Sequence, residues 1–149
     1  LDVTAGRAFA AELRTHFPRA RVVRATPATG ADDLAALARE LTPDTRLIVT
    51  THVRTIEGEG GFAVAPAVAT WVDSVARTAP TTVVSFSNPY VIRQFPSVGA
   101  YVATYGRGEA LERAAARALA GVAPITGRAP ISLPGYFRRG DGLQRTVQP

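Results

Sequence analysis

Short, continuous runs of apolar and β-branched residues recur along this chain and predict the strands of a buried sheet. The strongest run is Thr81 to Phe86, which lies between Pro80 and a polar turn at residues 87–90. A run of this length without polar alternation is typical of a strand that is buried on both faces. Further runs predict strands at residues 21–25, 46–51, 98–105 and 129–134. Prolines in and after the last run restrict that tail strand to the edge of a sheet.

Between these runs, apolar residues recur at the spacing of amphipathic helices. The first predicted helix follows Thr4, which we expect to cap it, and it ends before Pro18. A second helix carries Leu34 and Leu37 on its apolar face, and a third begins at Pro66. A fourth spans residues 109–120. Its inward face is expected to consist of Leu111, Ala115, Ala118 and Leu119.

Strands that alternate with helices indicate βαβ units and a parallel sheet. We therefore expect residues 1–149 to form a single α/β sandwich domain of flavodoxin-like type. Its sheet should be doubly wound and mostly parallel, with helices on both faces and the tail strand at the edge. In such sheets ligands bind at the carboxyl ends of the strands, so the loops after residues 51, 86 and 105 are the expected functional region.

Composition narrows the possible functions. All 17 basic residues are arginines, and they are spread along the chain rather than gathered in one patch, which argues against a nucleic-acid interface. Cysteine is absent, so disulfides, thiolate catalysis and zinc–thiolate sites are not available. No metal site or cofactor is expected, and no apolar run approaches the ~18 residues that a membrane span needs. The start at Leu1 without a methionine favours a piece of a longer protein.

A series of motifs runs in order through the second half of the chain. It begins with VVSFSNPY at residues 83–90, Phe95-Pro96 and AYVATY at 100–105. It continues with AAARALAG at 114–121 and TGRAPISLP at 126–134, and it closes with RGDGL at 139–143. Together these motifs resemble the C-terminal domain of family-3 glycoside hydrolases, in the bacterial β-N-acetylglucosaminidase branch.

The resemblance implies a two-domain hydrolase in which an N-terminal (β/α)₈ barrel, absent from this chain, holds the sugar and the catalytic aspartate. This chain would be the accessory C-terminal domain of a β-N-acetylhexosaminidase-type enzyme. Its implied partners are the barrel of the same polypeptide and a glycan that contains N-acetylglucosamine at the domain interface. The resemblance also favours an extracytoplasmic location, although this chain has no signal segment. A retaining glycosidase needs two carboxyl groups about 5 to 5.5 Å apart across the scissile bond. This chain is expected to offer at most one of them, so we expect the isolated domain to be inactive.

Three residues are candidates for acid–base chemistry. In the glucosidase branch of the family, the general acid comes from a loop of this second domain, and Glu57 and Glu59 lie in the nearest equivalent here. The competing interpretation is a solvated acidic loop. His52 follows a predicted strand and would serve either as a proton shuttle or only as a hydrogen-bonding partner of a neighbouring loop.

Four further residues are candidates for contact with the substrate or the barrel. Asn88 and Tyr90 lie in the turn after the strongest strand; alternatively Asn88 caps that turn and Tyr90 packs. Arg139 and Asp141 lie in the closing motif, where they would dock the barrel or order the tail. A different function also stays open, namely a free-standing α/β module that binds a small ligand at the carboxyl-end loops.

Overall fold

The computed structural model describes residues 4–53, 63–86 and 88–147, and the chain divides into two compact units. The sheet unit consists of Arg21–Arg107, and the terminal unit combines Leu1–Ala20 with Gly108–Pro149. The expected single sandwich domain therefore stays a prediction, and each unit is considered by itself.

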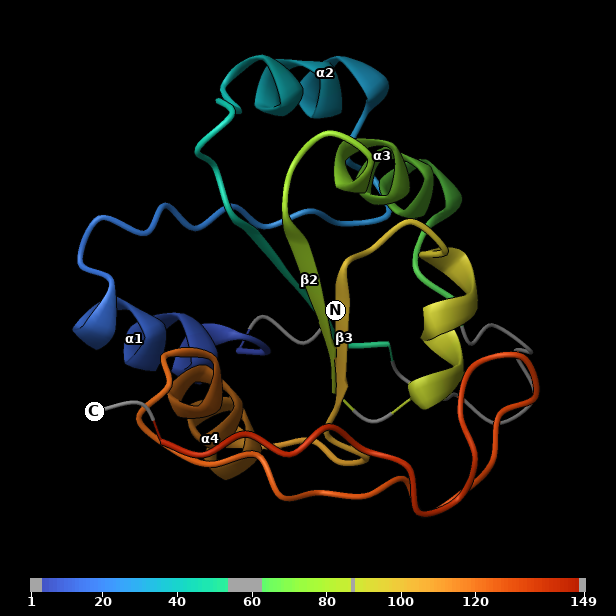
Figure 1. Ribbon diagram of the computed structural model, residues 1–149. Helices are drawn as coiled ribbons and strands as arrows, with labels where there is room; N and C mark the ends of the chain where they lie inside the picture. Colours follow the sequence, from blue (N-terminus) through green and yellow to red (C-terminus); the bar gives the residue numbers. More distant parts are fainter. Residues whose placement is uncertain (1–3, 54–62, 87, 148–149) are drawn as a thin grey trace. The chain divides into compact units, whose positions relative to one another are not determined.

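The sheet unit contains an open, fully parallel sheet of three strands in the order β1-β2-β3 (Figure 1). Its elements are α2 (Ala31–Arg39), β1 (Leu47–Thr51), α3 (Pro66–Ala76), β2 (Thr81–Ser85), the 3₁₀ helix η1 (Pro89–Gln94) and β3 (Ala100–Ala103). This arrangement confirms the predicted α/β class and is consistent with a flavodoxin-like fold. The predicted start of α3 is also confirmed, because Pro66 occupies its first turn, where the missing amide is not needed.

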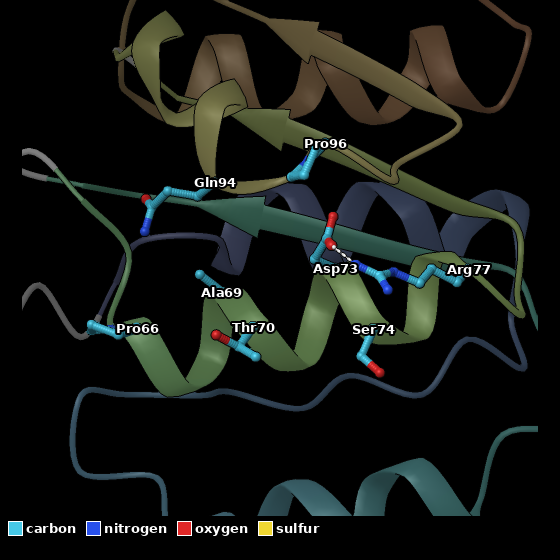
Figure 2. A pocket seen from close by; sticks show the side chains of 8 residues that line it. All are labelled: Pro66, Ala69, Thr70, Asp73, Ser74, Arg77, Gln94 and Pro96. Carbon is cyan, nitrogen blue, oxygen red and sulfur yellow. Dashed lines mark hydrogen bonds and ion pairs between the residues drawn. The ribbon is translucent and has the colours of Figure 1, made fainter.

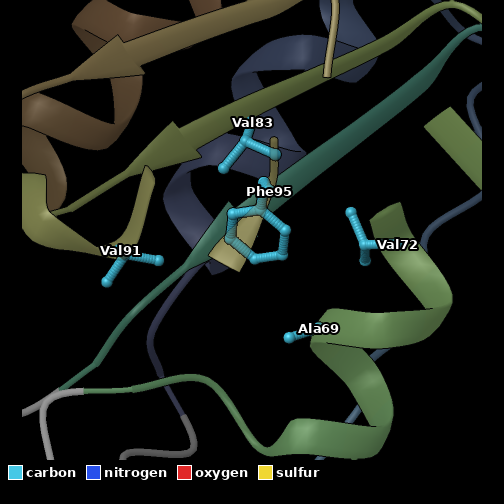
Figure 3. Packing of buried hydrophobic residues seen from close by; sticks show 5 residues of the cluster. All are labelled: Ala69, Val72, Val83, Val91 and Phe95. Atoms are coloured by element: carbon cyan, nitrogen blue, oxygen red, sulfur yellow. The ribbon is translucent and has the colours of Figure 1, made fainter. Parts of the chain in front are cut away.

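The core of the sheet unit forms where α3 and η1 meet one face of the sheet. Val49, Val83 and Tyr101 are paired across the three strands and therefore point to the same face. Val83 packs with residues from α3 and from the segment around η1 (Figure 3). The buried members of this cluster are Ala69, Val72, Val83, Val91 and Phe95. On the opposite face, Val84 is also completely buried.

Two predicted strands are not strands in the structure. Residues 21–25 belong to no helix or strand and pair with no strand among the described residues; they offer only two adjacent valines between arginines, so pairing would bury little apolar surface. The predicted edge strand at 129–134 instead belongs to an irregular hairpin within the tail. Isolated antiparallel bridges join Ile125 to Arg145 and Leu133 to Phe137. Pro130 and Pro134 have no amide hydrogen to donate to a neighbouring strand, which prevents a continuous strand at residues 129–134.

In the terminal unit, α1 (Arg7–His16) packs against α4 (Glu109–Leu119). The side chain of Glu112 is buried and binds the N-terminus of α1: its Oε1 accepts from the backbone amide of Gly6 at 2.8 Å, and its Oε2 from that of Phe9 at 3.1 Å. A carboxylate is favoured there by the free amides and by the helix dipole. The expected cap, Thr4, is therefore wrong, since the capping position is Gly6 and the acceptor comes from another helix.

Because Glu112 binds the N-terminus of α1, the buried face of α4 also differs from the predicted one. Its buried residues are Glu112, Ala115 and Ala116, whereas Leu111 is 36% exposed. Hydrophobicity alone assigns Leu111 to the core and Glu112 to solvent. The hydrogen bonds to α1 reverse this assignment, because they satisfy a carboxylate that would otherwise be costly to bury.

We expect Glu112→Gln to lower the free energy of unfolding by about 1 to 3 kcal/mol, because the amide nitrogen would face a backbone donor. Urea unfolding at neutral pH measures the change. Glu109→Gln on the same helix is the matched control, since that side chain is 79% exposed, and it should change stability by less than about 0.5 kcal/mol. Equal effects of the two variants would contradict this role of Glu112.

Candidate functional site

A compact group of polar residues lies at the carboxyl ends of the three strands of the sheet unit. Thr51, Ser85 and Ala103 share one register row at this end. The hydroxyl of Ser85 donates to the carbonyl of Asn88 at 2.6 Å, and the backbone amide of Thr104 donates to the carbonyl of Ser85 at 3.1 Å. These bonds fix the chain where it leaves β2 and β3.

Asn88, a predicted substrate or barrel contact, has a structural role here. It is 8% exposed, and its Oδ1 accepts from the backbone amide of Tyr90 at 2.9 Å, which caps η1. The Tyr101 hydroxyl donates to the carbonyl of Pro89 at 3.2 Å, and burial raises the pKa of that hydroxyl. The alternative interpretation of Asn88 as a turn cap agrees with this geometry.

Tyr90 differs from Asn88 because its side chain is available at the surface. It is 49% exposed, and the guanidinium of Arg93 lies over its ring at 5.8 Å from the centroid. This distance is within the range of a cation–π contact. Tyr90 and Arg93 therefore present a planar aromatic and cationic surface on η1.

His52 directly follows β1, as predicted, and its ring is stacked on Phe86. The two ring centroids are 4.8 Å apart and the planes are inclined by 10°. This contact holds the imidazole at the carboxyl end of the sheet. The neighbouring Thr51 hydroxyl is buried and makes no hydrogen bond to the residues that the structure describes. Glu57 and Glu59, the two predicted carboxylates, lie outside the described residues.

Arg139 and Asp141 lie in the terminal unit and order the hairpin of the tail. The carboxylate of Asp141 accepts from the backbone amide of Arg138 at 2.7 Å, and the backbone amide of Arg139 donates to the Ser132 hydroxyl at 2.8 Å. Gly140 has a positive φ of 92° and forms, with Asp141, a bulge opposite Ala129. Asp141 is therefore engaged in local structure, while the Arg139 side chain is exposed.

A shallow groove of about 530 Å³ along α3 was not predicted from the sequence (Figure 2). Its lining includes Asp73 on α3, Arg77 directly after α3 and Gln94 at the end of η1. Asp73 accepts from the backbone amide of Ser97 at 2.7 Å, from the Ser97 hydroxyl at 3.0 Å and from Arg77 at 3.2 Å. The signal available in the sequence was the i, i+4 spacing of Asp73 and Arg77, which predicts a helical ion pair but not the bond to Ser97.

Burial alone would raise the pKa of Asp73. The hydrogen bonds from Ser97 and Arg77 outweigh burial and hold the pKa of this carboxyl below its ordinary value of 3.8. Gln94 is similarly engaged, since its side chain accepts from the backbone amide of Val64 at 2.8 Å and donates to the carbonyl of Val64 at 2.9 Å. The side chains of Asp73 and Gln94 are thus engaged in hydrogen bonds that connect α3 and the segment before it to the segments around η1.

Within the described ranges, no three metal-binding side chains come together. The described part of the chain also contains no helix that is long and apolar enough to cross a membrane. Comparison of the chain with models of protein families, with curated proteins and with solved structures yields no match.

Asp73→Asn should destabilise the protein by about 1 to 3 kcal/mol at neutral pH, because it replaces a buried carboxylate oxygen that accepts from the half-buried Ser97 and from Arg77. The folded-state pKa is depressed, so the stabilisation by the carboxylate is present above the unfolded-state pKa and is lost as pH falls below 3.8 through the folded-state value. Urea unfolding of both proteins between pH 7 and pH 2 measures the difference, which should shrink with acidification. Asp44→Asn, at an exposed position, is the control. A difference that grows on acidification would refute the assignment.

Gly142→Ala should destabilise the tail hairpin, because an added Cβ would lie 2.5 Å from the carbonyl oxygen of Gly127. Backbone atoms cannot move aside as a side chain does, so the loss should be about 1 to 3 kcal/mol. Urea unfolding measures it. Gly127→Ala is the matched control, since no atom lies within 4 Å of its added Cβ. A neutral Gly142→Ala variant would show that the close approach is absent in solution.

Proposed function

We propose that this chain is the accessory C-terminal domain of a family-3 glycoside hydrolase of the β-N-acetylhexosaminidase type, which packs against and supports a catalytic (β/α)₈ barrel. The observation that carries the proposal is the ordered motif series from Val83 to Leu143. The α/β class and the parallel sheet agree with such a domain. The motif VVSFSNPY contributes most of β2 and the capped turn into η1, so this part of the series has a physical role.

A supporting role fits the state of the candidate residues better than catalysis does. Asn88 and Asp141 both use their side-chain oxygens to accept from nearby backbone amides. His52 is stacked on Phe86. The site residues that the structure describes thus contribute mainly to the order of the turn and the tail. Among these predicted site residues, none forms with another the pair of carboxyl groups that a retaining glycosidase requires.

Large apolar side chains at the surface also support packing against another domain. In the sheet unit Val22, Val23 and Tyr90 are each about half exposed, and in the terminal unit Leu143 is 80% exposed. Exposed apolar surface of this kind is often covered in an assembly. We assign Tyr90, with its neighbour Arg93, to contact with the barrel or with a glycan that contains N-acetylglucosamine, because aromatic rings stack on both apolar surfaces and sugar rings. Arg139 is assigned to barrel contact because its side chain is exposed and its backbone is held by Ser132.

One observation favours the second candidate function, a small-ligand-binding α/β module. Thr51 is 5% exposed at the carboxyl end of β1, and its buried hydroxyl has no hydrogen-bond partner in the described part of the chain. A ligand in the carboxyl-end loops would satisfy it. One unsatisfied hydroxyl does not specify a ligand, so we rank this function second.

The test begins with the coding sequence upstream of the codon for Leu1, where we expect a hydrolase barrel. The longer polypeptide should hydrolyse a chromogenic β-N-acetylglucosaminide, whereas the isolated chain of residues 1–149 should show no turnover above buffer. Removal of residues 1–149 from the longer polypeptide should lower its melting temperature, because the barrel would lose the surface that covers it.

Three outcomes would overturn the proposal. The first is an upstream sequence without a hydrolase barrel. The second is turnover by the isolated chain, which would make it an enzyme in its own right. The third is saturable binding of a nucleotide or sugar by the isolated chain in calorimetric titration, lost in Thr51→Val. That result would favour the ligand-binding module.

A further inference from the structure

The tail of the terminal unit, residues 121–147, is exposed along almost its whole length. Leu133 is the only one of these described residues that is buried, and isolated antiparallel bridges order the segment in place of a helix or a longer strand (Figure 1). Val122, Tyr136 and Leu143 are 40%, 43% and 80% exposed. Ordering an irregular segment costs conformational entropy, and burial within its own unit offsets little of that cost here. A second surface that covers the tail would supply the missing burial.

The tail also carries more than half of the net charge of the chain. It contains four arginines and one aspartate, a net charge of +3, whereas the whole chain has a net charge of +5. The carboxylate of that aspartate, Asp141, accepts from the backbone amide of Arg138. Of the four arginine side chains, Arg128 donates to the carbonyl of Gly140 at 3.0 Å, and the other three make no hydrogen bond or ion pair with the residues that the structure describes. The tail is therefore complementary to an acidic surface.

A concavity of about 510 Å³ lies within the hairpin of the tail. Its lining includes Ser132, Tyr136 and Arg138, together with Asp141, whose carboxylate is already bonded. The Ser132 hydroxyl accepts from the backbone amide of Arg139 at 2.8 Å, so its own proton remains available to a ligand. Tyrosine and arginine are enriched among the residues that contribute most to binding at protein interfaces. The concavity thus combines an aromatic ring, a cation and a hydroxyl donor, which suits an acidic side chain of a partner.

A protein partner suits this composition better than a nucleic acid or a membrane does. Aromatic residues and arginine are enriched at protein interfaces, where aspartate and glutamate are depleted, and residues 121–147 contain one aspartate and no glutamate. A nucleic-acid interface is more polar and more strongly charged, and it has no use for an aliphatic side chain as exposed as Leu143. A membrane-binding segment is a compact basic cluster or an amphipathic helix, whereas these arginines are separated along a described segment without a helix.

We propose that residues 121–147 dock onto an acidic and partly apolar surface of the catalytic barrel, and that the concavity beside Tyr136 and Arg138 receives an acidic side chain of that surface. This docking rests on the proposed function, which supplies the barrel. Docking covers Leu143, and the guanidinium of Arg138 pairs with the carboxylate of the partner. The bonds within the hairpin hold both anchor residues in position before the barrel binds.

Hydroxyl-radical labelling of the longer polypeptide, followed by mass spectrometry, tests the docking at single side chains. Tyr136 and Leu143 should be labelled several-fold more slowly there than in the isolated chain of residues 1–149. Phe86, which is 1% exposed, should stay unlabelled in both and reports that the fold is intact. Arg138→Glu in the longer polypeptide should restore the labelling rate of the isolated chain, because it places a carboxylate against an acidic surface. Arg39→Glu, at an exposed position of α2, is the matched control and should keep the slow labelling.

The outcomes separate this docking from the proposed function. Equal labelling of Tyr136 and Leu143 in the two proteins, with the barrel present, would overturn the docking and leave the proposed function intact. An upstream sequence without a barrel would remove the proposed function together with this partner. Slow labelling that Arg138→Glu leaves unchanged would overturn the acidic contact. Binding of the isolated chain to vesicles of phosphatidylcholine and phosphatidylserine, or to duplex DNA, with loss of binding in Arg138→Glu, would assign the tail to a different anionic partner and would also overturn the docking.

Discussion

The central strand β2 is the element on which the sheet unit depends. The backbone groups on both of its edges must be hydrogen-bonded, and the side chains on both of its faces must be buried. Its backbone pairs with β1 on one side and with β3 on the other. Val83 and Val84 are both completely buried although they point to opposite faces. The polar side chains of β2 lie on either side of this valine pair: the Thr81 hydroxyl donates to the carbonyl of Ala79, and the Ser85 hydroxyl donates to the carbonyl of Asn88. The composition of residues 81–86 follows from this constraint.

The same constraint determines the geometry of the carboxyl-end turn. The pairing of β2 ends level with that of its neighbours, and Pro89 and the Asn88 side chain then begin η1. η1 then returns Val91 and Phe95 to the face that carries Val83. The turn is thus a structural consequence of the buried strand. It is also the place where a parallel sheet would bind a ligand, so a residue such as Asn88 is assigned to function as easily as to structure when only the sequence is known.

Local signals predicted much of the fold, and contacts between distant residues account for what they missed. The run at 81–86 and Pro66 are local features, and both gave correct elements. The burial of Glu112 depends on amides more than 100 residues away in sequence, and hydrophobic periodicity contains no trace of it. The tail strand at 129–134 was predicted from composition, but its pairing partner lies in the same hairpin. For the candidate site, Asn88 was placed correctly at a strand end, whereas the bond from Ser97 to Asp73 joins a helix to a loop and has no pattern of its own.

The kind of partner that suits this chain follows from which groups remain available. Asp73, Asn88, Asp141 and Gln94 already accept or donate hydrogen bonds within their own units. The groups left at the surface include aromatic and aliphatic side chains such as Tyr90 and Leu143, together with exposed arginines. A small polar ligand needs several convergent hydrogen-bonding groups. At the described carboxyl ends of β2 and β3, the side chains of Ser85, Asn88 and Thr104 already bond to the backbone of the same unit. Protein surfaces are recognised mainly by apolar, aromatic and arginine side chains, so the exposure of Tyr90, Leu143 and the arginines agrees with the proposed role in packing against a barrel.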